Sequence, residues 1–172
     1  MRNAHCSHCG VKFNVSMPFP RQCGGCKEIT YINPAPVVEI LVPVGEGLLV
    51  IRRNIEPKLG QLAIPGGYMN MGETWQKGCS RELQEETGLV VRPEEITLFD
   101  VQTGSNGHLL VFGLAPCHDT LDVSRLKHDH EVSEITVIYQ DHFQFEDLAF
   151  PTHTAVARKY FEATNGGLLY PV

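Results

Sequence analysis

The chain has 172 residues, of which 42% are hydrophobic and 20% are charged, as expected for one compact domain with a small appendage. Its formal net charge of −6 argues against loose binding to a nucleic-acid backbone, which depends on Lys and Arg side chains. No segment approaches the roughly 20 apolar residues of a membrane helix, and the polar start does not resemble a signal peptide. We therefore expect a cytoplasmic protein with no nucleic-acid partner and no membrane contact.

Residues 1–33 carry four of the six cysteines, arranged as two Cys-x-x-Cys pairs, and show little apolar periodicity. Cys6 and Cys9 form the first pair, and Cys23 and Cys26 form the second. Four thiolates with this spacing can surround one tetrahedral Zn²⁺ at about 2.3 Å, which closes every coordination position. The segment therefore predicts a structural zinc ribbon. A zinc that binds nucleic acid or takes part in catalysis is the alternative, which the lack of a basic, aromatic face disfavours.

Residues 34–172 are expected to form an α/β domain in which a mixed sheet lies between helices. Two β-rich runs, separated by Gly45 and Gly47, indicate a hairpin. A helix should follow and end at Gly88, because glycine is typical of the position after a helix. In chain order the expected elements are strands at 37–42 and 48–51, a helix at 74–87, strands at 96–101, 109–114 and 135–139, and a helix from 151 to about 163.

The segment 67–89 combines glycines, glutamates and one arginine at regular spacing. On the predicted helix Glu82, Glu85 and Glu86 stand at i, i+3 and i+4, so they project from one face. Their repulsion would raise their pKa values, and a hard divalent cation such as Mg²⁺ or Mn²⁺ would remove it. The alternative is a solvated acidic face on which Arg81 pairs with Glu85. The glycines and the further glutamate that flank this helix argue against the alternative.

The same segment matches the Nudix box, G-x5-E-x7-R-E-U-x-E-E-x-G-U with U aliphatic, at every specified position. The chain therefore resembles the Nudix hydrolases, which implies an α/β/α sandwich that cleaves the diphosphate of nucleoside-diphosphate derivatives. The resemblance further implies that Glu85 and Glu86 are the main metal ligands, assisted by Glu82 and the backbone carbonyl of Gly67. Arg81 would then orient the carboxylates.

The resemblance does not identify the general base. Nudix enzymes often place a late glutamate near the metals, and Glu131 and Glu134 are the candidates, with Glu134 favoured; a charged turn is the alternative. Arg52 and Arg53 resemble a basic pair that faces the substrate phosphates in related enzymes. The alternative is that both are solvent-facing charges at the end of a strand. Only one of the two can point to the site, since neighbours on a strand face opposite ways.

Motifs outside the box resemble one zinc-ribbon branch of the family. They are the ribbon, Tyr31-x-Asn33-Pro34, Arg52-Arg53-Asn54-Ile55-x-Pro57 and Phe145-x-x-Leu148-Ala149-Phe150. That branch acts on FAD and ADP-ribose and releases AMP, which implies a small nucleotide as partner. NADH and NAD-capped RNA are alternatives, but the chain lacks the Ser-Gln-Pro-Trp-Pro-Phe-Pro segment of the NADH pyrophosphatases. A nucleoside triphosphate pyrophosphatase and a non-catalytic nucleotide sensor are further functional alternatives. A homodimer is a further hypothesis that rests on analogy.

Overall fold

The computed structural model describes residues 3–14, 16–104 and 107–166. The chain divides into two compact units, Met1–Pro34 and Ala35–Val172. Within the described residues, no helix has the length and apolar composition that a bilayer-spanning segment requires. The second unit contains the elements of the main fold.

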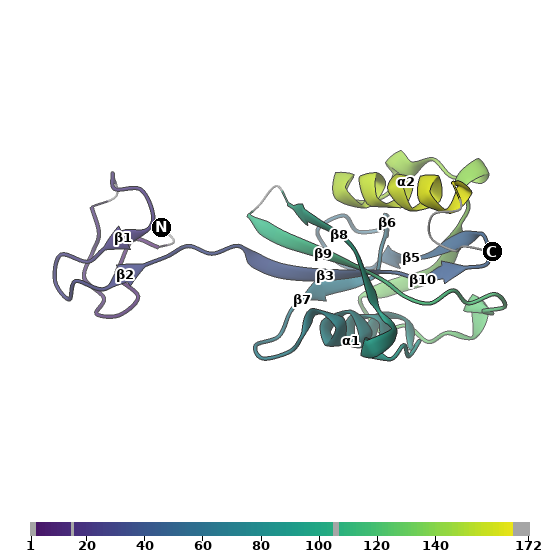
Figure 1. Cartoon of the computed structure of the whole chain (residues 1–172), viewed down its shortest axis with the longest axis horizontal. Helices are drawn as coiled ribbons and strands as arrows, with labels where there is room; N and C mark the ends of the chain where they lie inside the picture. The colour runs from purple at the N-terminus through teal and green to yellow at the C-terminus, as the bar shows by residue number, and fades with distance from the viewer. Residues whose placement is uncertain (1–2, 15, 105–106, 167–172) are drawn as a thin grey trace. The chain divides into compact units, whose positions relative to one another are not determined.

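In the described part of the second unit, two α-helices lie on either side of a group of short strands (Figure 1). Four short 3₁₀ turns lie in the connections. The strands are β3 (Ala35–Leu41), β4 (Pro43–Val44), β5 (Gly47–Arg53), β6 (Leu62–Ala63), β7 (Gly66–Tyr68), β8 (Thr97–Thr103), β9 (His108–Leu114) and β10 (Val132–Ile138), and the helices are α1 (Trp75–Thr87) and α2 (Pro151–Asn165). The turns cover Pro93–Glu95, Val123–Arg125, Gln140–His142 and Phe145–Asp147.

The strands form two sheets. The first has the order β7-β3-β9-β8, in which β3 and β9 run parallel and the other neighbours antiparallel. The second has the order β10-β5-β4, with β6 also paired to β5, and all of its pairs are antiparallel. The expected mixed sheet is confirmed.

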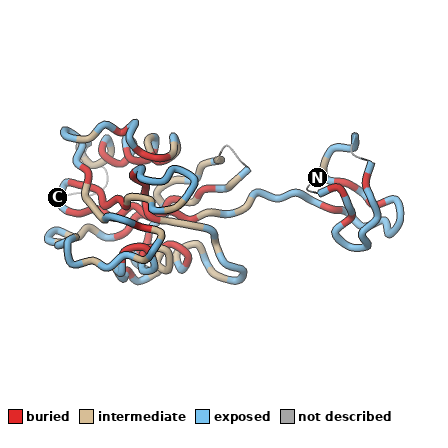
Figure 2. Tube along the Cα trace, turned by 180° about the vertical axis from the view of Figure 1, so that it is seen from behind, coloured by how far each residue is buried: buried red, intermediate tan, exposed pale blue. Residues whose placement is uncertain are grey.

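Alternate residues of the central strands face different helices. In β3, the fully buried Ile40 packs in an apolar cluster with Leu83 of α1, whereas its neighbour Leu41 packs in a cluster with Tyr160 of α2. This period of two is what a strand covered on both faces requires. Figure 1 shows α1 and α2 on opposite sides of the strands, and Figure 2 shows the buried residues gathered between them. The expected α/β/α sandwich is therefore confirmed.

Local capping defines both ends of α1. The side chain of Thr74 accepts a hydrogen bond from the backbone N–H of Lys77, so Thr74 caps the helix and is not its first residue. At the other end Gly88 adopts the left-handed conformation, with φ 70°, and its N–H donates to the carbonyl of Gln84. A Cβ at Gly88 would also lie 3.0 Å from the Lys127 carbonyl oxygen. These features fix the predicted helix within one residue.

The hairpin expected between residues 37–42 and 48–51 is wrong in extent. The partner of β5 in this hairpin is the short strand β4, whereas β3 lies in the other sheet and runs parallel to β9. A strand buried on both faces carries no local signal of its partner, so the apolar run could not reveal this pairing. The expected elements also lack the short strands β6 and β7, because runs of two or three residues are too short to show the alternation that predicts a strand.

Candidate functional site

The motif at 67–89 runs from β7 into α1 and brings main chain against carboxylates. Oε2 of Glu86 accepts a hydrogen bond of 2.8 Å from the backbone N–H of Gly66. A Cβ at Gly67 would lie 2.6 Å from both carboxylate oxygens of Glu82, closer than real Cβ atoms come. A side chain at Gly67 would therefore displace this carboxylate, and glycine permits the close approach seen here.

Arg81 holds three carboxylates through its guanidinium group. It lies 2.8 Å from Glu73, 2.6 Å from Glu82 and 3.0 Å from Glu85, and it also donates to the carbonyl of Tyr68. The hydrogen bonds with Glu73 raise the pKa of Arg81 and lower the pKa of Glu73. One positive charge faces three acidic groups, so an excess of negative charge remains on this face of α1. A divalent cation would neutralise it.

Burial and neighbouring charge both act on the carboxylates of this face. Burial raises the pKa of Glu86 well above its usual range; the Gly66 N–H opposes this shift and the charges of Glu82 and Asp129 add to it. Burial also raises the pKa of Glu82, opposed by Arg81. A cation beside these groups would stabilise their ionised forms.

The carboxylates are not gathered as tightly as a closed metal cage. Among the described residues, only the four ribbon cysteines bring three or more potential ligand atoms within 4.8 Å of one another. Arg81 contacts both Glu82 and Glu85. The donor set is nevertheless suited to a hard cation, because it consists of carboxylate oxygens beside a main chain held close by glycine.

A cavity of about 330 Å³ opens beside the glycines of β7. Its volume lies at the lower end of small-molecule sites, which span about 300–1,000 Å³. Arg53 stands in its wall, with its guanidinium carbon 5.5 Å from the centre of the Phe150 ring, and it is the one Lys or Arg among the described lining residues. The lining residues are Val37, Glu39, Arg53, Pro57, Ile64, Gly66, Gly67, Tyr68, Gly104, His108, Leu110, Phe150, Pro151, Thr152 and His153.

The structure separates the two arginines at the end of β5. Arg53 lines the cavity, whereas Arg52 does not, and the Nε of Arg52 donates to Oε2 of Glu134 at 2.6 Å. Glu134 lies opposite Arg52 in the ladder between β10 and β5. The favoured base candidate is thus paired with an arginine and is absent from the cavity lining. Glu131 lies beside the end of β5, because its backbone carbonyl accepts a hydrogen bond from the backbone N–H of Asn54.

Three functional candidates were missed in the sequence. Asp129 lies close enough to Glu86 to affect its pKa, but its place in a His-rich loop gave no distinguishing signal. Glu39 and His153 line the cavity although both are buried. A glutamate inside the apolar run 37–42 was an available signal for the first, and nothing in the sequence pointed to the second.

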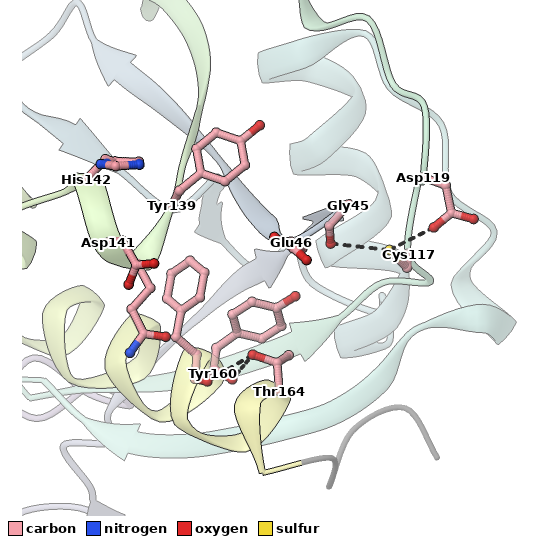
Figure 3. A pocket seen from close by; sticks show the side chains of 11 residues that line it. Gly45, Glu46, Cys117, Asp119, Tyr139, Asp141, His142, Tyr160 and Thr164 are labelled. Atoms are coloured by element: carbon pink, nitrogen blue, oxygen red, sulfur yellow. Dashed lines mark hydrogen bonds between the residues drawn. The ribbon is translucent and has the colours of Figure 1, made fainter. Parts of the chain in front are cut away.

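A larger hollow of about 690 Å³ lies elsewhere on the same unit (Figure 3). Cys117 and Asp119 face it from one side and Asp141 and His142 from the other (Figure 3). Its described lining contains acidic residues and no Lys or Arg, and it lacks Gly66 and Gly67, the residues of the smaller cavity that approach the α1 glutamates. An acidic hollow of this kind repels phosphates. We therefore place the candidate site at the smaller cavity.

The N-terminal unit holds its four cysteines in two equivalent turns. In each turn the first cysteine donates its N–H to the carbonyl five residues ahead, Cys6 to Val11 and Cys23 to Glu28. The residue four positions after each first cysteine donates back to that cysteine's carbonyl. A small antiparallel pair, β1 (Arg21–Gln22) with β2 (Ile29–Thr30), completes the unit.

The sulfur atoms have the spacing of one tetrahedral ion. Cys6 and Cys26 Sγ lie 3.7 Å apart and Cys9 and Cys23 Sγ lie 3.5 Å apart, near the edge of about 3.8 Å of a tetrahedron with bonds of about 2.3 Å. The backbone N–H groups of Cys9 and His8 lower the pKa of the Cys6 thiol to about 6, which favours the thiolate that a metal requires. The four cysteines can therefore hold one Zn²⁺.

Comparison with known proteins agrees with this geometry. The sequence model of the NUDIX domain matches residues 33–164. An ADP-ribose pyrophosphatase of Methanocaldococcus jannaschii is 35% identical over 66 residues, which cover 38% of this chain and 39% of that protein. The NAD-capped RNA hydrolase NudC of Yersinia enterocolitica is 23% identical over 162 residues, covering 93% of this chain and 58% of that protein. The chain thus spans well under two thirds of either relative's length.

Among solved structures, the crystal structure of a NUDIX hydrolase from Nitrosomonas europaea superimposes with a TM-score of 0.76 at 25% sequence identity. The superposition covers 95% of this chain and 93% of that one. The similarity therefore extends over nearly the whole length of both chains.

The ribbon should contain one zinc per chain, measured by metal analysis. We expect Cys9→Ser to abolish stoichiometric zinc and to collapse the amide NMR signals of residues 3–30 while those of the second unit persist, because a small unit without a large core depends on its metal. Cys117→Ser is the matched control. Zinc retained in Cys9→Ser, or lost equally in Cys117→Ser, would contradict the assignment.

The raised pKa of Glu86 predicts a response to pH in the metal-free chain. Above the ordinary pKa of 4.5 the unfolded state releases a proton that folded Glu86 retains, so stability should fall as pH rises until the raised value is passed. Added Mg²⁺ should restore stability on the alkaline side. Glu86→Gln should reduce both the loss of stability with rising pH and the recovery with Mg²⁺. Each kcal/mol of stability changes Tm by about 2–4 °C.

Thermal unfolding at pH 5 and pH 8, with and without Mg²⁺, measures these changes. The exposed Glu94→Gln variant is the control, because it removes the same charge elsewhere. Equal pH and Mg²⁺ responses in wild type and Glu86→Gln would show that Glu86 is not the group involved.

Proposed function

Since the chain belongs to the Nudix family, we propose that it is a divalent-cation-dependent pyrophosphatase that hydrolyses ADP-ribose or a similar nucleoside-diphosphate derivative and releases AMP. The observation that carries the proposal is the carboxylate-bearing face of α1, which meets Gly66 and Gly67 at the edge of a cavity containing Arg53. The M. jannaschii ADP-ribose pyrophosphatase supports the substrate class.

The cation, Mg²⁺ or Mn²⁺, would be held by Glu82, Glu85, Glu86 and the backbone carbonyl of Gly67. When bound, it supplies positive charge that offsets the diphosphate and assists ionisation of water. Arg81 positions the carboxylates of Glu82 and Glu85 through its contacts of 2.6 and 3.0 Å. Gly67 keeps the main chain close enough to contribute its carbonyl.

The remaining groups bind phosphate and move one proton. Arg53 would bind a phosphate oxygen from the cavity wall, where its charge is partly shielded from solvent. Glu134 is retained as the proposed base on sequence grounds, with Arg52 holding its carboxylate. It would accept the proton of water as the water oxygen bonds to phosphorus. The bridging P–O bond then breaks, and AMP and ribose 5-phosphate leave.

NAD-capped RNA or NADH is the second candidate substrate. The observation in its favour is similarity to NudC along 162 residues, a length that must include much of the ribbon as well as the catalytic domain. The net charge of −6 opposes binding of a long RNA. FAD, implied by the resemblance of the motifs, belongs to the same group of dinucleotide substrates.

Arg53→Ala should raise KM for the diphosphate substrate about tenfold, because a charge-assisted hydrogen bond to phosphate is lost. Arg52→Ala should raise KM less than about threefold, since Arg52 does not line the cavity. Initial rates at varied substrate concentration separate KM from kcat in each variant. A larger rise in KM for Arg52→Ala than for Arg53→Ala would reverse the assignment.

Product analysis tests the function itself. ADP-ribose, FAD, NADH, an NAD-capped RNA and an oxidised nucleoside triphosphate are each incubated with and without Mg²⁺ or Mn²⁺, and the products are identified by mass spectrometry. From ADP-ribose we expect the products AMP and ribose 5-phosphate, and we expect them only when the metal is present. Glu85→Gln should lower kcat at least about 100-fold because a cation ligand is lost.

Glu95→Gln, which changes an exposed surface pair with Arg92, is the control for this loss. Undiminished activity of Glu85→Gln would refute the site. Nucleotide binding without turnover of any substrate would instead favour the nucleotide-sensing alternative.

A further inference from the structure

Glu39 places a buried carboxylate in the cavity wall that the proposed reaction does not use. The residue is 6% exposed and sits in the middle of β3, paired with Gly66 of β7 on one side and Phe112 of β9 on the other. Its Oε2 is fully buried and has no hydrogen-bond partner among the described residues. Burial of an ionisable group at the centre of a sheet is unfavourable unless a neighbouring group compensates its charge.

His153 of α2 holds this carboxylate at close range. Its Nε2 lies 2.6 Å from Oε2 of Glu39, although the contact lacks hydrogen-bond geometry. Its Nδ1 accepts a hydrogen bond of 3.0 Å from the backbone N–H of Ile64, so the ring proton of neutral His153 belongs to Nε2, on the side of Glu39. The rings of Phe112 and Phe150 flank the imidazole edge-on, with centroids 6.4 and 4.9 Å away.

This environment favours one kind of ligand group. A carboxylate accepts hydrogen bonds and cannot donate them, so it attracts donors and repels phosphate oxygens. A metal cation at this point is disfavoured, because the proton-bearing Nε2 of His153 already lies 2.6 Å from Oε2 of Glu39. Arg53 lies on the same cavity wall and can take the phosphate. The part of a nucleotide that meets Glu39 is therefore expected to carry no negative charge and to present N–H or O–H groups.

We propose that Glu39, positioned by His153, is the specificity-determining acceptor of the cavity and binds a hydrogen-bond donor of the substrate's nucleoside part. The donor is either a ribose hydroxyl or the exocyclic amine of adenine, which share this chemistry. This assignment rests on the proposed function in taking AMP as the bound product. Ligands that present only acceptors at this position are rejected, because they would leave the buried carboxylate opposite another oxygen.

Glu39→Gln gives a test with a defined sign. The amide is nearly the same size. Because the protonated Nε2 of His153 lies beside this position, the carbonyl oxygen is expected there and the NH₂ group toward the cavity. The variant thus exchanges an acceptor for a donor at this point. Affinity is measured by calorimetry for AMP, IMP, 2′-deoxy-AMP and 3′-deoxy-AMP, with wild type, Glu39→Gln and the surface control Glu95→Gln.

We expect wild-type affinity to fall about tenfold for the analogue that lacks the recognised donor. This loss should vanish in Glu39→Gln and persist in Glu95→Gln, which is the signature of a direct pairwise interaction. Loss confined to IMP assigns the base amine, and loss confined to a deoxy analogue assigns the ribose. Equal losses in wild type and Glu39→Gln, no discrimination by wild type, or no binding of AMP would each overturn the proposal.

A structural measurement covers the case in which Glu39→Gln does not fold. In a crystal structure of the wild-type chain with AMP, a Glu39 carboxylate oxygen should lie within about 3.2 Å of an amine or hydroxyl of the nucleotide. A nucleotide bound without this contact refutes the proposal. Binding does not require turnover, so hydrolysis without discrimination defeats only this inference, and discrimination without hydrolysis defeats only the proposed function.

Discussion

Repulsion among the carboxylates of α1 is the constraint on which the site depends. Arg81 offsets part of it by contacting Glu73, Glu82 and Glu85, and the Gly66 N–H offsets part of it at Glu86. The remainder cannot be removed by packing, because an apolar neighbour would only deepen the burial that already raises the pKa of Glu86. The arrangement is therefore costly for the metal-free chain and suited to a cation.

The close approach of the main chain to the carboxylates of α1 depends on the sheet that lies between the two helices. Strand β3 packs on α1 through Ile40 and on α2 through Leu41, so the two helices are fixed relative to one strand. Carboxylates come from α1, while α2 brings His153 to Glu39 on the other side. A displacement of β3 would disturb both, which links the carboxylate-bearing face of α1 to the cavity lined by Glu39 and His153 through packing alone.

The two units of the chain are stabilised by different means. The second unit buries clusters of aliphatic and aromatic side chains on both faces of its strands. In the N-terminal unit the main buried cluster consists of Cys6, Phe13 and Cys23, which is too small for a stable core. Without a metal, the four thiolates repel one another. When an ion is bound, its bonds to the thiolates stabilise the unit in place of a large core.

Sequence alone determined the features that depend on local spacing. The two cysteine pairs, the end of the helix at Gly88, and the common face of Glu82, Glu85 and Glu86 all follow from backbone geometry over a few residues. Tertiary structure decided which strand pairs with β3, that Arg53 and not Arg52 lines the cavity, and that Glu39 meets His153. These depend on contacts between segments far apart in the chain, and a strand buried on both faces carries no local mark of its neighbours.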